Sequence, residues 1–453
     1  MITQKIFIKT FGCQMNEYDS NRIYDTVKKI GYKKTEIYED ANIYLLNTCH
    51  IRDKAAEKMY SDLGRIKKIY ENNNLIKPII AVAGCVAQAE GKEITKRSPW
   101  VDLVVGPQAY TDLPKLLEKI NENSKKKEIN LKFPEIPKFD LLNFDKKIGK
   151  VSDFVTIQEG CDKFCSFCVV PFTRGPEYSR TRKSIMDEIK IMAQNGVKEI
   201  ILLGQNVNAW KDDANESKAY TLGYLIEDIA KIDEILSIRY TTSHPLDMDL
   251  ELIKAHKNID KLMPYLHLPI QSGSDNILKK MNRRHTASEY LKIIELVRKY
   301  CEDIAISSDF IVGHPGETNE DHKKTLDIIN EVKFASSYSF MYSERPGTKS
   351  SEFGEIVDEN IKKIRLHQIQ NKLNHYQLAF NKNMEGLELP ILITDKNKKN
   401  QLLGRSPYNQ TVYIDEENLP VKKHYEKLIG SMLDVKIIKS NQNTLLGSFT
   451  KNA

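Results

Sequence analysis

The first part of the chain alternates short apolar runs with amphipathic segments. Lys5–Thr10, Ala41–Asn47 and Ile79–Ala83 have the length and composition of buried strands. Helical periodicity fills the intervals between them, at Asn21–Ile30 and Asp53–Tyr70. Strand–helix alternation of this kind predicts a doubly wound parallel sheet.

The middle of the chain repeats the strand–helix pattern with longer intervals. The expected strands are Phe154–Gln158, Glu199–Leu203, Ser237–Thr242, Leu266–Ile270, Ile304–Val312 and Ser336–Met341. Helical patterns separate them at Ser184–Asn195, Thr221–Ile232, Ala287–Tyr300 and Glu320–Val332. These units predict a partial (β/α)6 barrel of the TIM type, in which chemistry lies at the carboxyl ends of the strands.

The last part of the chain changes period again. Asp358–Asn381 carries the apolar stripe of one long helix, which we expect to pack on the barrel. Five short strand patterns follow and predict a small β-barrel. They are Glu388–Thr394, Leu402–Arg405, Thr411–Ile414, Met432–Ile438 and Leu445–Thr450.

These patterns predict an α/β protein with several domains. We expect a flavodoxin-like parallel sheet in residues 1–120 and the partial barrel in 151–380, with the small β-barrel in 381–453. Residues 121–150 show lysines and prolines without clear periodicity, which predicts an exposed linker.

Composition narrows the class of protein. The 453 residues carry a net charge of +6, which is compatible with an RNA partner without requiring one. The chain opens on a strand pattern instead of a signal segment, and no apolar run reaches the length of a membrane span. Seven cysteines in such a chain favour metal ligands in a reducing compartment over disulfides. We therefore expect a cytoplasmic protein without membrane contact.

Three cysteines form the most specific chemical pattern. Cys161, Cys165 and Cys168 have the spacing C-x3-C-x2-C directly after the first strand of the barrel. Three thiolates can hold three irons of a 4Fe–4S cube and leave the fourth iron open for a ligand. We expect Phe167, between the last two cysteines, to contact the cofactor. The alternative is a structural zinc site, but zinc usually takes four ligands and no fourth cysteine or histidine follows closely.

Three further cysteines each follow a strand of the N-terminal sheet. Cys13, Cys49 and Cys85 stand just past the carboxyl ends of the predicted strands, the edge where open α/β sheets bind ligands. The alternative is that all three are buried as small hydrophobic residues. The threefold repetition of the position favours a second cluster.

Candidate cofactor contacts follow other strands of the barrel. Gly204, Gln205 and Asn206 follow the second strand, where a glycine lets a cofactor approach and amides can bind it. Gln271 follows the fourth strand, and Gly313 and Gly316 follow the fifth. For each of them the alternative is a tight turn between strand and helix.

Other side chains have less specific patterns. His244 and His267 are expected to be core histidines bonded to the backbone, ahead of any role as ligand or acid–base group. Arg174 either orients the cofactor or a phosphate or lies on the surface, and Cys301 is expected to be structural.

Motifs along the whole chain resemble the methylthiotransferase family of radical S-adenosylmethionine (SAM) enzymes. In the N-terminal part they are Thr10–Asn16, Asn47–Cys49 and Gly84–Gln88. In the barrel they are Cys168–Gly175, Leu203–Asn208, Thr242–Pro245, His267–Ser274, Met281–Thr286, Gly313–Thr318 and Tyr342–Thr348. The last part resembles a TRAM domain through Gly404–Asn409.

The resemblance implies a two-cluster enzyme. Cys161, Cys165 and Cys168 would hold the cluster that cleaves SAM, and Cys13, Cys49 and Cys85 an auxiliary 4Fe–4S cluster that delivers sulfur. One SAM would methylate a sulfur on the auxiliary cluster. A second would give the 5′-deoxyadenosyl radical, which removes hydrogen from C2 of an isopentenylated adenosine beside a tRNA anticodon. The methylthio group then joins that carbon, and an external donor supplies electrons.

The TRAM resemblance implies contact with RNA. We expect exposed Arg405, Tyr408, Lys422 and Lys423 to bind phosphate and unpaired bases. Gln410 stands where the pattern has a basic residue, so one phosphate contact is missing.

Two rival interpretations are left open. The first comprises related methylthiotransferases that act on threonylcarbamoyladenosine or on a ribosomal-protein aspartate. The segments Cys168–Gly175 and Thr242–Pro245 favour the isopentenyladenosine branch over these. The second is a non-catalytic iron–sulfur protein that carries electrons or binds RNA.

Overall fold

The structure is a computed structural model with two compact units. It describes residues 4–50, 53–72, 76–122, 126–135, 138–141, 150–212, 220–415 and 425–449. The first unit comprises residues 1–145, 159–162 and 169–178, and the second comprises 146–158, 163–168 and 179–453.

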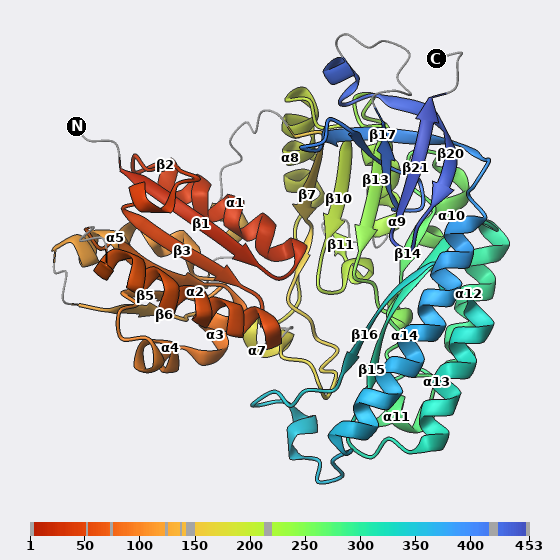
Figure 1. The fold of residues 1–453 in the computed structure, drawn as a ribbon, viewed down its shortest axis with the longest axis horizontal. Coiled ribbons are helices and arrows are strands. Elements are labelled where there is room, and N and C mark those ends of the chain that lie inside the picture. The colour runs from red at the N-terminus through yellow and green to blue at the C-terminus, as the bar shows by residue number, and fades with distance from the viewer. Residues whose placement is uncertain are drawn as a thin grey trace. The chain divides into compact units, whose positions relative to one another are not determined.

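The first unit is built on a parallel sheet. Its strand order is β2-β1-β3-β4-β5-β6, and every neighbouring pair is parallel. The strands are β1 (Lys5–Phe11), β2 (Lys33–Lys34), β3 (Ile43–Thr48), β4 (Ile79–Ala83), β5 (Leu103–Val105) and β6 (Glu128–Asn130). Figure 1 draws them from red to orange. The order 2-1-3-4-5 is that of flavodoxin-like folds, whose ligand site lies where the order reverses, between β1 and β3.

Helices connect the strands of this sheet. They are α1 (Gln14–Lys28), α2 (Asp53–Asn72), α3 (Cys85–Glu90), α4 (Lys92–Arg97) and α5 (Leu113–Glu122). Residues on one face of α2, among them Met59, Leu63 and Ile66, pack with Leu46 and Val82 of the central strands. Every residue of β3 is buried, as expected for a central strand covered on both faces.

The second unit contains the partial barrel. Its strands are β7 (Ser152–Thr156), β10 (Glu199–Leu203), β13 (Ser237–Thr241), β14 (Tyr265–His267), β15 (Ala305–Val312) and β16 (Ser336–Met341). They form the parallel sheets β13-β10-β7 and β14-β15-β16. The helices are α8 (Arg182–Gln194), α9 (Leu222–Ala230), α10 (Leu250–Asn258), α11 (Asp275–Lys280), α12 (Ala287–Tyr300), α13 (Asn319–Val332) and α14 (Glu359–Lys382). Figure 1 shows α12, α13 and α14 side by side.

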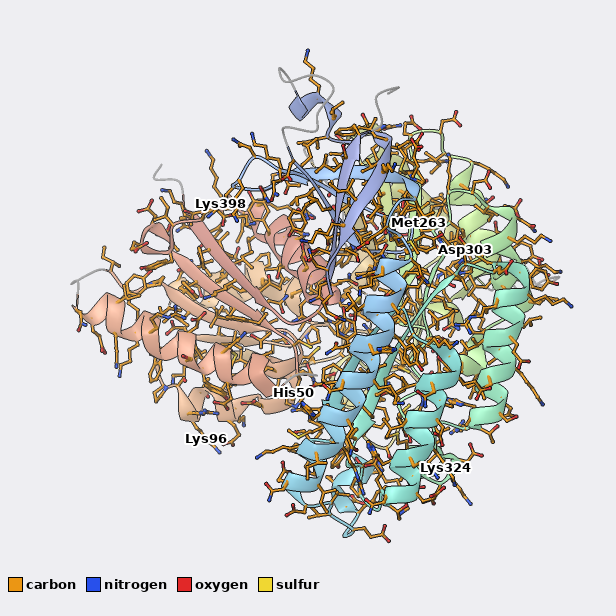
Figure 2. The ribbon with its side chains drawn as sticks, turned by 45° about the vertical axis from the view of Figure 1, so that its right-hand side comes forward. His50, Lys96, Met263, Asp303, Lys324 and Lys398 are labelled. Carbon is orange, nitrogen blue, oxygen red and sulfur yellow. The ribbon has the colours of Figure 1, made fainter. Side chains whose placement is uncertain are left out.

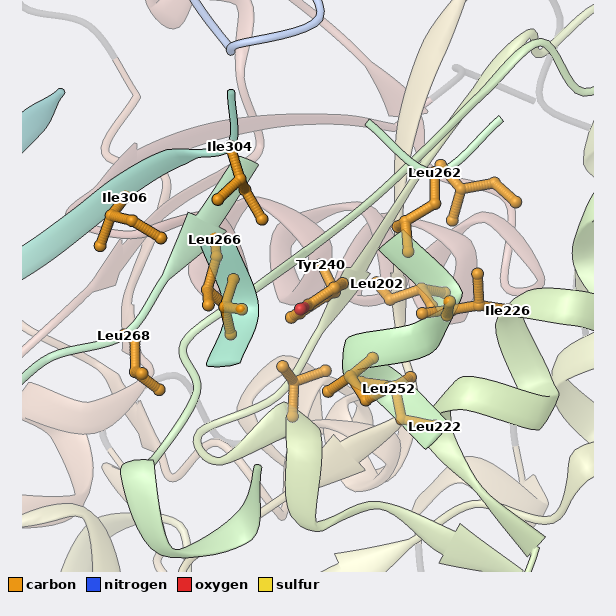
Figure 3. Packing of buried hydrophobic residues seen from close by; sticks show 14 of the residues in the cluster. Leu202, Leu222, Ile226, Tyr240, Leu252, Leu262, Leu266, Leu268, Ile304 and Ile306 are labelled. Atoms are coloured by element: carbon orange, nitrogen blue, oxygen red, sulfur yellow. The ribbon is translucent and has the colours of Figure 1, made fainter. Parts of the chain in front are cut away.

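Alternate residues of the barrel strands build the core against these helices. Leu202, Tyr240, Leu266 and Ile306 are all buried and pack in one cluster with Leu222, Ile226 and Leu252 from the helices (Figure 3). Because side chains alternate along a strand, the intervening residues face away from the helices. Glu199 and Arg239 are two of these, and both are buried.

Local signals explain where two of the helices begin. Thr286 before α12 and Thr318 before α13 each accept a hydrogen bond from the backbone N–H three residues on. The carboxylates of Glu289 and Asp321 accept in turn from the backbone N–H groups of these threonines. Such capping boxes satisfy backbone N–H groups that have no partner inside the helix.

The C-terminal strands close a small barrel within the second unit. Their order is β17-β18-β19-β21-β20, with β17 (Glu388–Lys396), β18 (Leu402–Arg405), β19 (Thr411–Ile414), β20 (Met432–Ser440) and β21 (Thr444–Phe449). Ile391, Ile393, Val412, Val435 and Ile437 form its core.

The turn after β18 docks this small barrel on the partial barrel. Arg239 of β13 donates to the carbonyl oxygens of Ser406 at 2.7 Å and Pro407 at 2.9 Å. Tyr408 donates to Asp303. Asp303, which follows α12, is labelled in Figure 2. Gln410 donates to Asn381 of α14 at 2.8 Å.

The docking contacts change two sequence expectations. Tyr408 is half-buried and bonded to Asp303, so the expectation that it is exposed for RNA is wrong. Arg405 is also half-buried, and it donates to Asn409 and lies 4.0 Å from Glu199. Lys422 and Lys423 lie outside the described residues.

Several element boundaries differ from the sequence expectations. The fourth barrel strand is only Tyr265–His267, because the regular ladder is interrupted after His267. Gln271, which has a left-handed φ of 77°, rejoins β15 through a single bridge to Phe310. α1 begins seven residues earlier than the apolar periodicity indicated, at Gln14. The segment expected to be an irregular linker contributes β6 to the sheet and the short helix α6 (Lys138–Leu141).

Candidate functional site

Three cysteines meet at the carboxyl edge of the sheet in the first unit. Cys13 caps α1 after β1, Cys49 follows β3, and Cys85 begins α3 after β4. β1 and β3 are the strands at the reversal of strand order, so Cys13 and Cys49 flank the position where such sheets bind ligands. Cys49 and Cys85 are buried.

The turn at Gly12 sets how closely two of these cysteines approach. Gly12 has a left-handed φ of +117°, and a Cβ added to it would lie 2.1 Å from the Cβ of Cys49. Any side chain at this position would therefore displace Cys49 and strain the turn.

Neighbouring groups set the charge state of these thiols. A hydrogen bond with Cys49 lowers the pKa of Cys13, burial raises it, and the positive charge of Arg174 lowers it further, to about 6 overall. Burial raises the pKa of Cys85, and Arg174 acts against that rise. Thiolate is the form that binds metal, so Arg174 favours the ligand state of both cysteines.

Arg174 belongs to a buried ion network in the first unit. It donates to Asp19 at 2.7 Å and to Glu159, and Lys138 donates to Glu159 at 2.7 Å and lies 3.4 Å from Asp19. Asn16 links the network to the cysteines, because its Oδ1 lies 3.3 Å from Arg174 and 3.7 Å from the Sγ of Cys13. Arg174 is therefore buried and paired with two carboxylates, so the surface role is wrong.

The C-x3-C-x2-C loop follows β7 and is divided between the units. Cys161 belongs to the first unit, where its N–H donates to the carbonyl of Gly175 at 3.3 Å. Cys165 and Cys168 belong to the second unit and are joined by a backbone bond of 3.0 Å from Cys168 to Cys165. All three are half-buried, as is Phe167.

Asn206 is the most strongly positioned of the predicted cofactor contacts. Its N–H donates to Gln158 at 3.0 Å, and its Nδ2 donates to Asp247 at 2.8 Å. Its Oδ1 is buried and has no hydrogen-bond partner among the described residues. A buried acceptor without a partner is costly, so a ligand donor at this position would be stabilising.

The other predicted contacts are held by the fold around them. A Cβ at Gly204 would lie 2.7 Å from the side-chain oxygen of Gln158, and one at Gly313 would lie 2.3 Å from the side chain of Lys362. A Cβ at Gly316 would lie 2.0 Å from side-chain atoms of both Glu355 and Lys280. Gln205 is half-buried. Gln271 is buried and exchanges backbone bonds with Asp309 and Ile311 of β15. These contacts explain why the glycines and Gln271 stand in tight turns. Contact of these residues with a cofactor stays a prediction.

The histidines of the barrel differ from one another. His244 accepts from the backbone N–H of Leu246 at 3.2 Å, as expected of a core histidine. His267 is bonded to side chains instead, 3.0 Å from the Oγ of Ser307 and 3.6 Å from Asp309. Cys301 caps the end of α12, where burial and Asp303 raise its pKa to about 12.

Each cysteine set offers three thiols, the number of protein ligands that an iron–sulfur cube with one open iron takes. All seven cysteines are described, and none of them is in a disulfide. Across the described ranges, no three His, Cys, Asp or Glu side chains are close enough to hold one metal ion.

Family models match the chain in three consecutive regions. Residues 5–106 match the uncharacterized protein family UPF0004, 155–329 match the radical SAM superfamily, and 382–450 match the TRAM domain. The first region contains β1 to β5 of the sheet, the second contains most of the partial barrel, and the third contains the whole small barrel.

Curated relatives match the chain from end to end. A tRNA-2-methylthio-N(6)-dimethylallyladenosine synthase of Pelagibacter ubique is 52% identical and covers 99% of this chain and 98% of its own. Proteins of the same name from Ehrlichia ruminantium and Anaplasma phagocytophilum are 51% and 46% identical, over 98% and 100% of this chain. The chain belongs to this synthase family. Its members are radical SAM enzymes with SAM and iron–sulfur clusters as cofactors.

Solved structures support the fold. The radical SAM methyltransferase TsrM from Kitasatospora setae, with cobalamin and a 4Fe–4S cluster bound, has a TM-score of 0.57 and 11% identity over 77% of each chain. The cobalamin-dependent radical enzyme OxsB has a TM-score of 0.53 and 12% identity, covering 82% of this chain and 56% of its own. At this level of identity the likeness shows the fold alone.

Sequence reasoning missed part of the site. It assigned no role to Asn16, Lys138 or Glu159, which form the polar surroundings of the auxiliary cysteines. It also missed Arg283, whose Nη1 lies 3.6 Å from the Sγ of Cys165. The motif Met281–Thr286 contains Arg283, but its spacing gives no sign of a contact 118 residues away.

Proposed function

We propose that this protein is a tRNA methylthiotransferase that adds a methylthio group at C2 of an isopentenylated adenosine beside the anticodon. The observation that carries the proposal is the end-to-end similarity to synthases of that name, together with two separate sets of three cysteines at the ends of parallel strands. The bound cofactors supply radical formation from SAM and the sulfur atom.

In this proposal Cys161, Cys165 and Cys168 are ligands of the SAM-cleaving cluster. They lie where the first strand of the barrel ends, the edge at which such barrels bind substrates. Asn206 offers a buried, unpartnered oxygen at the end of the next strand, which suits a cofactor N–H or hydroxyl donor. Gly204, Gln205, Gln271, Gly313, Gly316 and Phe167 remain proposed contacts of SAM.

Cys13, Cys49 and Cys85 are the proposed ligands of the auxiliary cluster. The charge of Arg174 lowers the pKa of Cys13 and opposes the rise that burial causes in the pKa of Cys85. Cys49 and Cys85 are buried, which limits access of water to them. Water exclusion matters because exposed sulfur and radical chemistry are lost to side reactions.

The substrate and the remaining partners follow from the chemistry. An adenosine in an anticodon loop is unpaired and can be turned into a protein pocket. The TRAM domain is the proposed site of further RNA contact, and an external one-electron donor is required to reduce the SAM-cleaving cluster. We also propose a cytoplasmic location. Within the ranges that the structure describes, no helix combines the length and apolar character needed to cross a bilayer.

The decisive experiment is anaerobic reconstitution with iron, sulfide and SAM. The protein is reduced and given a defined tRNA that carries isopentenyladenosine, and the nucleosides are analysed by mass spectrometry. The expected product is 2-methylthio-N(6)-isopentenyladenosine. A matched tRNA with threonylcarbamoyladenosine is the control. Modification of that tRNA instead would favour the first rival, and failure to cleave SAM at all would favour a non-catalytic protein.

A further inference from the structure

The segment Met281–Asn282, which follows α11, is hydrogen-bonded to the cysteine loop within the second unit. The carbonyl of Met281 accepts from the N–H of Ser166 at 3.0 Å. The side chain of Asn282 donates to the carbonyls of Lys163 at 3.2 Å and Phe164 at 2.9 Å. These bonds join two segments that are more than 110 residues apart and fix the backbone around Cys165.

Three residues at this contact adopt left-handed backbone conformations. Phe164, Asn282 and Arg284 have φ values of 47°, 57° and 58°. A non-glycine residue in this region costs about 1–2 kcal/mol, and the surrounding structure must hold it there. The bonds of Asn282 to the loop supply that hold, so the loop and the segment fix each other.

Arg283 is a buried cation whose partners include no carboxylate. Its side chain is 5% exposed, Nη1 lies 3.6 Å from the Sγ of Cys165, and Nη2 donates to the carbonyl of Pro269. Among the described residues, its Nε has no hydrogen-bond partner, and the partners of its two other nitrogens are a sulfur and a carbonyl and not a carboxylate. A buried charge without a counter-charge is strongly destabilising.

Other buried arginines of this chain are neutralised by carboxylates. Arg239 pairs with Glu199 at 2.7 Å and Arg365 with Glu317 at 2.7 Å. Arg283 lies beside the sulfur of Cys165 instead of a carboxylate. That sulfur becomes anionic when it binds metal. His244 and His285, which interact with Arg283, are neutral or cationic and cannot serve as its counter-charge. Burial together with the charge of Arg283 lowers the pKa of His285 to about 4, and the same two causes lower that of His244 to about 2.

We propose that Arg283 is the counter-ion of the SAM-cleaving cluster, with Met281–Asn282 as the clamp that holds its cysteine loop. The inference rests on the proposed ligand role of Cys165. A cation that donates to a cluster ligand stabilises the more negative, reduced state and so raises the reduction potential. Arg283 is thus a positioning residue that makes the cluster easier to reduce.

The test isolates one cluster. Cys13, Cys49 and Cys85 are replaced together by Ala in the full chain, which is reconstituted anaerobically with iron and sulfide. Arg283→Gln and Arg283→Lys are made in this background. Iron per chain is measured, and the reduced cluster is titrated by electron paramagnetic resonance without SAM. We expect Arg283→Gln to move the midpoint potential to a more negative value and Arg283→Lys to move it less, because Lys keeps the charge.

Control variants separate charge from structure. Arg298→Gln removes a half-buried arginine of α12 that donates to the carbonyl of Val332, and it should leave the potential unchanged. Asn282→Gly keeps the left-handed turn and removes the two side-chain bonds of the clamp, so the cluster should lose iron to a chelator faster at an unchanged potential.

The outcomes distinguish the two levels of the proposal. If the parent with only Cys161, Cys165 and Cys168 binds no cluster, the ligand assignment fails and the role of Arg283 fails with it. If the parent binds a cluster and Arg283→Gln has the same potential, only the counter-ion role is wrong. If folded Arg283→Gln binds no iron, recovery of binding by Arg283→Lys supports the role of the charge, and failure of both variants would mean a purely structural role.

Discussion

Glu199 shows how one buried carboxylate organises the second unit. It begins β10 and accepts from Ser152 and Ser237 at 2.8 Å each and from Arg239 at 2.7 Å. Arg239 in turn holds the turn after β18 through Ser406 and Pro407. The pair therefore connects the amino end of the partial barrel to the small β-barrel.

We predict that Glu199→Gln destabilises the second unit by about 3–5 kcal/mol, because it leaves the guanidinium of Arg239 buried without a full counter-charge. Urea unfolding is followed through the fluorescence of Trp210, a buried residue of this unit, with Trp100 of the other unit replaced by Phe. Glu227→Gln is the control. Its partner Lys231 is exposed, so the change should stay within about 0.5 kcal/mol. Equal stability of both variants would contradict the role of Glu199.

The same carboxylate predicts a pH dependence. Burial raises the pKa of Glu199, but the charges of Arg239 and Arg405 outweigh burial and hold the pKa below its ordinary value. A lowered pKa in the folded state stabilises the protein above the unfolded value, about 4.3 for Glu, and that stabilisation is lost as pH falls through the folded value. The stability difference between parent and Glu199→Gln should therefore be full at pH 7 and shrink below pH ~4. A difference that does not depend on pH would refute this.

At the scale of elements, strand ends and their turns position the candidate ligands. β1, β3 and β4 each deliver a cysteine to one edge, and the turn at Gly12 lets Cys13 and Cys49 approach. The capping boxes of α12 and α13 fix where helices begin but touch no candidate ligand. The turns are therefore the elements whose change should affect the cofactors.

We predict that Gly12→Ala prevents loading of the auxiliary cluster, since the added Cβ meets Cys49 and the φ of +117° disfavours alanine. In a chain with Cys161, Cys165 and Cys168 replaced by Ala, iron should fall from about four per chain to near zero. Gly64→Ala on α2 is the control, because a Cβ there has no neighbour within 4 Å. Full loading of a folded Gly12→Ala protein would show that the turn tolerates a side chain.

At the scale of the whole molecule, the two cysteine sets should have separable roles. Replacing Cys13, Cys49 and Cys85 by Ala should leave formation of 5′-deoxyadenosine from SAM intact and abolish methylthiolation of tRNA. Replacing Cys161, Cys165 and Cys168 should abolish SAM cleavage and leave about four irons per chain. Chromatography of the nucleosides and iron analysis measure both. Loss of both activities in a folded first variant would mean that the clusters do not act separately.

The TRAM domain should have two roles, in RNA binding and in stability. A chain ending at Asn381 should bind the anticodon stem-loop more weakly and with a shallower salt dependence. It should also unfold at lower urea, because Arg239 and Asp303 lose their partners Pro407 and Tyr408. Binding isotherms at several salt concentrations and urea unfolding measure the two effects. Unchanged affinity and salt slope would exclude the domain from RNA binding.

The sequence by itself determined most of the strands and helices and the position of the cysteines at strand ends. Strands such as Ile79–Ala83 and Glu199–Leu203 and the helix Ala287–Tyr300 were predicted with the bounds that the structure has. Periodicity, caps and turn residues act over a few positions, so they can be interpreted without tertiary context. The placement of Cys13 and Cys49 at strand ends followed for the same reason.

Only the tertiary structure decided which distant groups meet. Arg283 lies beside Cys165, and Lys138 of the expected linker is buried beside Glu159. Tyr408 bonds to Asp303 where the small barrel docks on the partial barrel. No local sequence signal predicts these contacts. The neighbouring residues in the sequence are the same whether a charged or aromatic side chain faces solvent or a buried partner. Burial and counter-charge depend on the topology that joins remote segments, and that topology decides which polar groups are paired and which are left for a cofactor.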